Sequence, residues 1–93
     1  MIRINPTGDF DDSYREFVRS DPELKSTILS HMLWFRKNPA DSRLRNHKLT
    51  GRMKGKWVFS VTNDIRIVYT WVGKQAVRLL AVGRHPDVYP KSG

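Results

Sequence analysis

The sequence of 93 residues contains no cysteine. This absence excludes a disulfide framework, a thiolate-bound metal and a cysteine nucleophile. No segment approaches the roughly 20 apolar residues that a membrane-spanning helix needs, and the stretch MIRINPTGDF lacks the apolar core of a signal peptide. We therefore expect a cytoplasmic protein without a membrane partner.

The motifs of several enzyme classes are also missing. There is no Gly-rich phosphate loop, no Walker pattern and no G-x-S-x-G segment. The three histidines follow neither H-E-x-x-H nor another close metal-ligand spacing. We therefore expect neither a cofactor nor a bound metal.

Acidic residues are scarce in the second half of the chain. Residues 1–42 hold 6 Lys and Arg against 7 Asp and Glu, a net charge of −1, whereas residues 43–93 hold 11 against 2, a net charge of +9. Such a basic surface favours a polyanionic partner, above all a nucleic acid. An acidic protein partner, or a basic surface that serves only solubility, is compatible with the same charge.

Residues 1–20 contain the signals of a strand followed by a helix. Side chains alternate over residues 1–4 as in a short strand, and the cluster Asn5–Pro6–Thr7–Gly8 ends it. An amphipathic helix is predicted next, because four apolar side chains recur at helical spacing. These are Phe10, Tyr14, Phe17 and Val18.

A second helix is predicted between Asp21 and Asn38. Asp21 is suited to the N-cap and Pro22 to the first helical position. An apolar stripe then continues to the stop signal at Asn38–Pro39. It consists of Leu24, Ile28, Met32 and Phe35. Because the connection is tight, the two helices are expected to pair antiparallel.

From residue 57 onward the patterns are those of strands. Residues 57–62 alternate, Asn63–Asp64 provides a short connection, and residues 65–71 form the next strand. Gly73–Lys74 supplies a second turn. Residues 76–82 are a nearly continuous apolar run, which is typical of a central strand buried on both faces.

These elements predict one α+β domain that spans residues 1–93. It has an N-terminal strand, an antiparallel two-helix hairpin and a three-stranded antiparallel meander, which form one sheet with the helices on one face. Residues 43–56 show no clear periodicity and are predicted as a loop with at most a short strand. The other face of the sheet is left for the basic, histidine-bearing residues.

Three titratable residues are candidates for acid–base chemistry: His47, Asp64 and His85. All three lie near predicted strand ends, which converge in a meander. Two imidazoles suit phosphodiester cleavage, because one group accepts the proton of the attacking hydroxyl while another protonates the leaving oxygen. Asp64 is suited to orient or tune one histidine. Unrelated surface histidines would show the same spacing.

The surrounding cations are candidates for phosphate binding and for stabilising charge in the transition state. A solvated basic face is the alternative interpretation. Arg66 differs because it lies within a strand: if Ile65 and Ile67 face the helices, Arg66 and Asp64 point together to the opposite face. The expected RNA-binding residues are Lys48, Arg52, Lys54, Lys56 and Arg84.

Aromatic side chains are candidates for stacking on RNA bases. Trp57 and Tyr69 lie on strands that must supply much of the core, so packing is the preferred role for both. Tyr89 follows the last predicted strand and is the better candidate for stacking or proton transfer.

Two blocks of the sequence resemble the RelE/ParE superfamily of bacterial toxins, and they are most similar to its YafQ-like ribonuclease branch. The blocks are HKLTGRMKGKWVFSVTNDIRIVY and LLAVGRHPDVY. The resemblance implies a toxin of a type II toxin–antitoxin system, an endoribonuclease that cuts mRNA in the ribosomal A site. It also implies a cognate antitoxin that holds the toxin inactive in a hetero-oligomer.

The resemblance further implies catalytic roles at the matching positions. His47 matches a histidine ahead of the L-x-G turn, and Asp64 matches an acidic residue before the following strand. His85 matches a C-terminal histidine and is the leading general acid or base. Arg66 matches a widely shared strand arginine, and Tyr89 the position of a functional tyrosine. The expected reaction is attack of the 2′-OH on the adjacent phosphate without a metal.

Two positions depart from the family pattern. Ser60 stands where YafQ-like members often carry a further histidine, which leaves one acid–base partner in question. Pro86 restricts the backbone of His85 toward extended geometry. Two other functions stay open: a ParE-like inhibitor of DNA gyrase, which needs no histidines, and a basic RNA-binding module without turnover.

Overall fold

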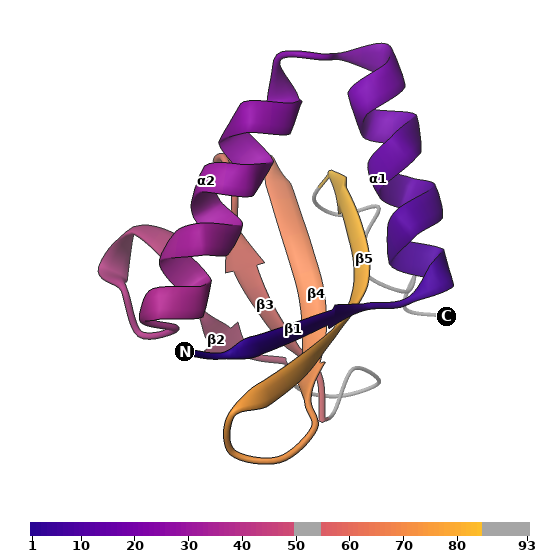
Figure 1. Cartoon of the computed structure of the whole chain (residues 1–93). Helices are drawn as coiled ribbons and strands as arrows, with labels where there is room; N and C mark the ends of the chain where they lie inside the picture. Colours follow the sequence, from indigo (N-terminus) through magenta and orange to yellow (C-terminus); the bar gives the residue numbers. More distant parts are fainter. Residues whose placement is uncertain (50–54, 85–93) are drawn as a thin grey trace.

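The computed structural model describes residues 1–49 and 55–84, which form two helices against one sheet (Figure 1). The elements in chain order are β1 (Arg3–Pro6), α1 (Gly8–Ser20), α2 (Leu24–Lys37), the short 3₁₀-helix η1 (Ser42–Leu44), β2 (His47–Lys48), β3 (Trp57–Ser60), β4 (Ile65–Trp71) and β5 (Ala76–Arg84). No helix of these described residues is long and apolar enough to cross a membrane.

The sheet has five strands in the order β1-β5-β4-β3-β2. The predicted antiparallel meander is present as β3, β4 and β5. β2 adds a two-residue strand beside β3, and β1 pairs in parallel with β5 at the other edge. The predicted α+β fold is therefore confirmed, with both helices on one face of the sheet (Figure 1).

β5 is an interior strand of the sheet, between β1 and β4, as its apolar run predicted, but it is not buried on both faces throughout. Val77 and Leu79 are buried against the helices, whereas Arg78 between them is exposed. The reason is that helices cover only one face of the sheet along this part of the strand.

The two helices run in opposite directions, as predicted, and diverge from their short connection toward β1 (Figure 1). The side chain of Thr7 caps α1: its Oγ1 accepts a hydrogen bond from the Phe10 N–H at 3.1 Å and donates to the Leu79 carbonyl at 2.9 Å. One threonine thus joins the start of α1 to β5.

The predicted N-cap role of Asp21 was wrong. Its backbone N–H donates to the Phe17 carbonyl at 2.9 Å and so ends α1. Pro22 lies in the turn before α2, and Glu23 takes the N-cap position without a side-chain hydrogen bond. The Asp21 carbonyl does accept a hydrogen bond from the Leu24 N–H at 3.0 Å, but no hydrogen bond of its side chain to α2 is present among the described residues.

Aromatic packing forms the centre of the core between α2 and the sheet. Phe35 of α2 is fully buried, with its ring 4.7 Å from that of Phe59 on β3 and 4.9 Å from that of Tyr69 on β4. Val58 and Val68 are also buried, yet they lie outside this cluster because they face the other side of the sheet. The core is therefore concentrated on the helix side.

Truncation of Phe35 should test this packing. We expect Phe35→Ala to lower the free energy of unfolding by about 3–5 kcal/mol, because it leaves a cavity beside two aromatic rings. Leu33→Ala, on the same helix but 52% exposed, should change it by less than about 0.5 kcal/mol. Urea unfolding measures both values, and equal losses would contradict this account of the core.

Candidate active site

His47 lies on the short edge strand β2, opposite Val58 of β3. Its side chain is exposed, and the ring atom Nδ1 is 2.9 Å from the carbonyl oxygen of Arg45. A carbonyl only accepts hydrogen bonds, so in the neutral ring the proton resides on Nδ1. Nε2 then carries the lone pair, and within residues 1–49 and 55–84 no hydrogen bond engages it, which gives His47 the chemistry of a general base.

The sheet register places His47 on the same face as Ser60 and Arg66. His47 pairs with Val58, Ser60 pairs with Arg66, and alternate residues of β3 share one face. This is the face away from the helices, since Ile65 and Ile67 are buried in the helix-side core. The prediction for the side chain of Arg66 is confirmed. Ser60 is buried and supplies no titratable group.

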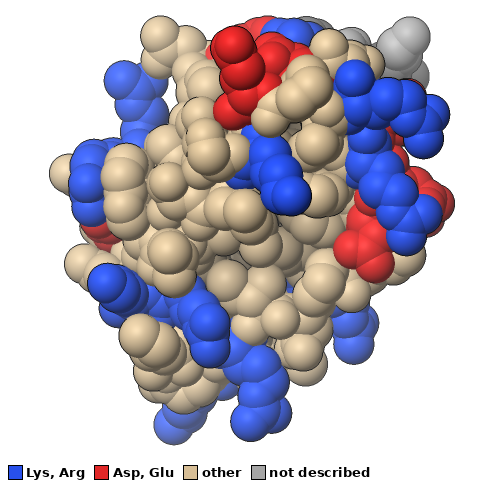
Figure 2. Space-filling model, turned by 45° about the horizontal axis from the view of Figure 1, so that its top comes forward, with Lys and Arg blue, Asp and Glu red and all other residues tan. Residues whose placement is uncertain are grey.

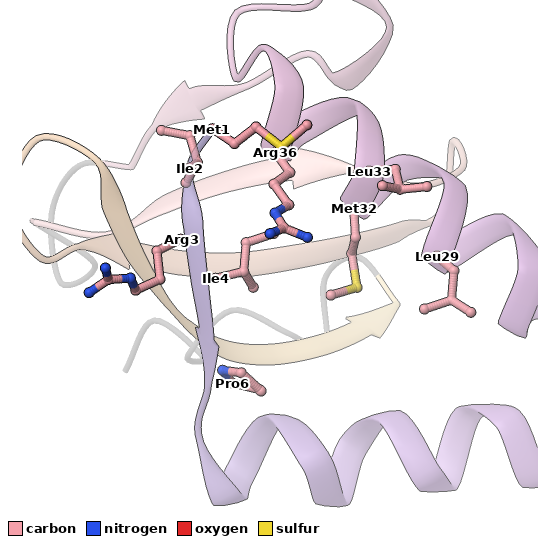
Figure 3. Close-up of a pocket in the computed structure, with 9 residues that line it drawn as sticks. All are labelled: Met1, Ile2, Arg3, Ile4, Pro6, Leu29, Met32, Leu33 and Arg36. Atoms are coloured by element: carbon pink, nitrogen blue, oxygen red, sulfur yellow. The ribbon is translucent and has the colours of Figure 1, made fainter.

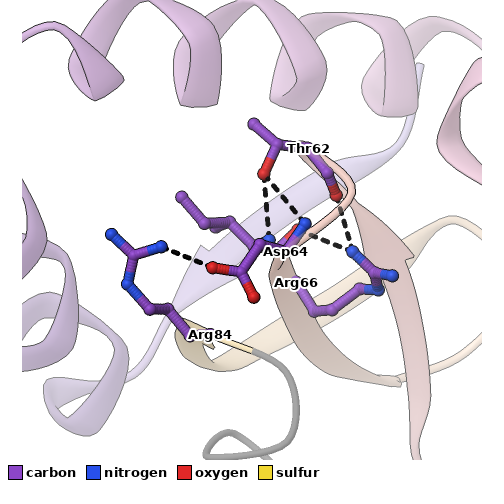
Figure 4. A network of polar contacts seen from close by, with 5 residues as sticks. Thr62, Asp64, Arg66 and Arg84 are labelled. Carbon is purple, nitrogen blue, oxygen red and sulfur yellow. Dashed lines mark hydrogen bonds and ion pairs between the residues drawn. The ribbon is translucent and has the colours of Figure 1, made fainter.

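The turn between β3 and β4 carries a small polar network (Figure 4). The hydroxyl of Thr62 accepts from the backbone N–H groups of Asp64 and Ile65 at 3.2 and 3.0 Å. Its carbonyl accepts from Nη1 of Arg66 at 2.6 Å. Arg66 is thus held by backbone oxygens, with no carboxylate bonded to it among the described residues.

Asp64 has a different partner from the one expected. Its carboxylate forms an ion pair with Nη1 of Arg84 at 2.5 Å (Figure 4). The guanidinium of Arg84 also lies 5.7 Å from the ring centroid of Phe17 in α1. Asp64 therefore turns toward the α1 side and does not point with Arg66 to the open face. The expectation that the two share a face was wrong, because Asp64 lies in the turn, where strand alternation does not apply.

The remaining predicted cations do not all lie on the sheet face of His47 and Arg66. Lys48 follows His47 on β2 and is exposed, but its side chain faces the other side of the strand. Lys56 precedes β3, and its carbonyl accepts from the Leu49 N–H at 2.9 Å. Four further predicted site residues lie outside the described residues and stay predictions: Arg52, Lys54, His85 and Tyr89.

The segment before β2 is anchored to α2. The carboxylate of Asp41 accepts hydrogen bonds from the backbone and guanidinium of Arg43, and that guanidinium lies 3.6 Å from the ring centroid of Trp34. These bonds lower the pKa of Asp41 to about 2. The resulting stabilisation is fully present above about pH 5, well above the unfolded pKa, and is lost as the pH falls through about 2.

Two further features of this site could not be read from the sequence. Asn46, next to His47, accepts a hydrogen bond from the buried hydroxyl of Tyr69, which is 23 positions away. Burial raises the pKa of Tyr69 to about 12.

Within residues 1–49 and 55–84, no group of three His, Asp or Glu side chains is arranged to hold a metal ion.

A second surface is an apolar groove of about 660 Å³ between β1 and α2 (Figure 3). Leu29 and Leu33 of α2 are 45% and 52% exposed there, and two cations, Arg3 and Arg36, belong to the lining with no carboxylate. The full lining is Met1, Ile2, Arg3, Ile4, Pro6, Leu29, Met32, Leu33 and Arg36. The view in Figure 2 shows a broad tan area of uncharged residues with Lys and Arg within and around it, and Asp and Glu at its upper and right edges. Leu29 and Leu33 repeat at i, i+4 beside the predicted core stripe, which was the available sequence signal.

Comparison with known proteins gives a consistent result. Residues 2–90 match the family model described as bacterial toxin of type II toxin-antitoxin system, YafQ. YafQ from E. coli has the same fold with a TM-score of 0.78 at 16% identity, covering 97% of this chain and 100% of that chain. No individually curated protein sequence matches significantly.

Two other solved structures share this fold. A copper-bound mutant toxin from Helicobacter pylori has a TM-score of 0.78 at 22% identity, covering 96% of this chain and 100% of that one. The heterotetrameric YoeB-YefM toxin-antitoxin complex from Staphylococcus aureus contains a chain with a TM-score of 0.71 at 19% identity, covering 91% of this chain and 98% of that chain.

The ion pair between Asp64 and Arg84 should contribute little to folding, because both side chains are about half exposed. We expect Asp64→Asn to lower the free energy of unfolding by less than about 1 kcal/mol, with a smaller difference at high salt. Urea unfolding with and without 1 M NaCl provides the measurement, because that salt shortens the Debye length to roughly 3 Å and screens the pair. A loss that is large and independent of salt would show that the pair is structural.

Proposed function

Because the chain belongs to the YafQ family of toxins from bacterial type II toxin–antitoxin systems, we propose that it is an endoribonuclease that cleaves mRNA in the ribosomal A site. The observation that supports this most directly is His47. It lies on the sheet face away from the helices, on the same face as Arg66, and among the described residues no hydrogen bond engages its Nε2. The net charge of +9 over residues 43–93 suits a surface that binds RNA.

The proposed reaction is attack of a ribose 2′-OH on the adjacent phosphate. One histidine takes the proton of the 2′-OH as its oxygen bonds to phosphorus, and the other gives a proton to the 5′-oxygen as its bond to phosphorus breaks. His47 and His85 fill these two roles, and the products are a 2′,3′-cyclic phosphate and a free 5′-hydroxyl. Tyr89 assists binding or proton transfer.

Cations bind the phosphate groups and stabilise charge that develops during this reaction. Arg66 belongs to the same sheet face as His47 and is the described cation best placed for this role. Arg52, Lys54 and Lys56 are proposed to extend the RNA-binding surface. Lys48 and Arg84, whose side chains lie toward the helix side, could reach RNA only at the edge of that surface. Asp64 holds Arg84 through their ion pair. Arg84 ends β5 and directly precedes His85 in the sequence, so Asp64 acts on the site indirectly. The reaction needs no metal ion.

We also propose that a cognate antitoxin occupies the groove between β1 and α2. The complex of YoeB with YefM supports an antitoxin partner for this fold. An apolar groove with Arg3 and Arg36 in its lining favours an amphipathic segment with acidic residues beside its apolar ones. Such a segment of an antitoxin, folding as it binds, would cover Leu29 and Leu33.

Replacement of the two histidines tests the proposed reaction. We expect His47→Gln and His85→Gln each to lower mRNA cleavage by about 10²–10⁴-fold, because each removes a general acid or base. His31→Gln is the matched control, since His31 lies on α2 and contacts Thr27 and Trp34. Primer extension on cellular mRNA after induction maps the cuts. Cleavage should persist with a chelator that removes transition metals and spares Mg²⁺.

Undiminished growth arrest by both histidine variants would contradict the ribonuclease proposal. If DNA gyrase activity then fell in the induced cells, the protein would act as a ParE-like gyrase inhibitor. Binding of mRNA without new 5′ ends would instead indicate an RNA-binding module. Cuts on naked RNA as strong as those on translated mRNA would contradict the ribosomal site.

A charge placed in the groove tests the antitoxin proposal. We expect Leu33→Glu to stay toxic but to bind the cognate antitoxin at least about 30-fold more weakly, roughly 2 kcal/mol, because it opposes an acidic apolar segment. Val72→Glu, which makes the same change from an apolar side chain to a carboxylate at a residue 46% exposed beyond β4, is the control. Co-expression with the antitoxin measures growth rescue. Full rescue of Leu33→Glu would place the antitoxin elsewhere.

A further inference from the structure

The turn that leads into His47 is tied to the centre of the sheet through one side chain, that of Asn46. Its Oδ1 accepts a hydrogen bond from the hydroxyl of Tyr69 at 2.6 Å, and its Nδ2 donates to the carbonyl of Pro39 at 3.0 Å. Because the Pro39 carbonyl can only accept, the two ends of the amide are not interchangeable. Asn46 is thereby held from two sides in one orientation.

Tyr69 provides a rigid anchor for this bond. Its side chain is fully buried on β4, and its ring contacts those of Phe35 and Phe59. Burial raises the pKa of Tyr69 to about 12, so the hydroxyl keeps its proton and remains a donor throughout the physiological range. The hydrogen bond from Tyr69 to Asn46 therefore persists through that range.

β2 has little ability to hold His47 by itself. It is a two-residue strand at the edge of the sheet, and among the described strands it pairs with β3 alone. Arg45, two residues before His47, has φ 50° and ψ 40°, in the left-handed region that a side chain with a Cβ disfavours. A short edge strand after a strained residue needs a constraint from elsewhere to keep one geometry.

This constraint reaches the imidazole through the backbone. The carbonyl of Arg45 belongs to the peptide that enters Asn46, and it accepts from Nδ1 of His47 at 2.9 Å. Fixing Asn46 therefore fixes the acceptor that holds the proton on Nδ1. Neutral histidine free in water prefers the opposite tautomer, with the proton on Nε2. The protein must therefore impose the Nδ1–H tautomer.

We infer that Tyr69 and Asn46 are positioning residues for His47, which hold its ring in the Nδ1–H tautomer and leave the Nε2 lone pair for proton transfer. The role in proton transfer rests on the proposed function. The orientation of the ring does not, because it follows from the hydrogen bonds alone. Neither positioning residue touches RNA.

Nuclear magnetic resonance of ¹⁵N-histidine-labelled protein tests the orientation directly. At a pH where His47 is neutral, we expect the wild type to carry its proton mainly on Nδ1. Tyr69→Phe and Asn46→Ala should each shift the population toward Nε2–H. In mRNA cleavage, both should lower kcat about tenfold with KM unchanged, a smaller loss than the roughly 10²–10⁴-fold expected without a general acid or base.

Thr70→Val is the matched control, because Thr70 is the next residue on β4 and its hydroxyl donates to the Gly55 carbonyl at 3.0 Å. It also removes one hydroxyl bond, but without contact to Asn46, and should match the wild type in both measurements. A wild-type ring protonated on Nε2, or a tautomer unchanged in Tyr69→Phe, would overturn the inference.

The two readouts distinguish failure of this inference from failure of the proposed function. A shifted tautomer with unchanged kcat would overturn the role of Tyr69 and Asn46 in proton transfer. If the wild type cut no mRNA, the proposed function would fail, while the tautomer measurement would still decide whether these residues orient His47.

Discussion

β1 pairs in parallel with β5, and this pairing constrains the path of the chain between them. The N–H of Arg3 donates to the Gln75 carbonyl at 2.7 Å, and that of Thr7 donates to the Leu79 carbonyl at 3.0 Å. Parallel strands require a crossover connection, so α1 and α2 must pass over one face of the sheet. The opposite face is left for the side chains of β2, β3 and β4.

Tyr69 connects the aromatic core to the turn before His47. Its ring belongs to the aromatic core beside Phe35, whereas its hydroxyl reaches the turn before His47. A chain of this size has one small core, so a residue there easily serves both packing and site geometry. The candidate base is consequently tied to a fully buried residue of the core, although its own strand is short.

The two candidate surfaces lie on different sides of the sheet. The groove is formed by β1 and α2 on the helix side, whereas His47 and Arg66 belong to the open face. A charge introduced at Leu33 therefore leaves the chemistry of His47 untouched.

Local periodicity in the sequence determined the elements and the face of Arg66, because Ile65 and Ile67 alternate with it. The same local rules gave a wrong N-cap at Asp21, which ends α1 in a short connection between two helices. They also gave a wrong side-chain direction at Asp64, which lies in a turn. They were silent on the contact of Asn46 with Tyr69, on the ion pair of Asp64 with Arg84, and on the parallel edge strand. Only the tertiary structure decided these, because a periodic pattern records what lies within about four residues. Bonds across 20 and 23 positions depend on the register of the sheet.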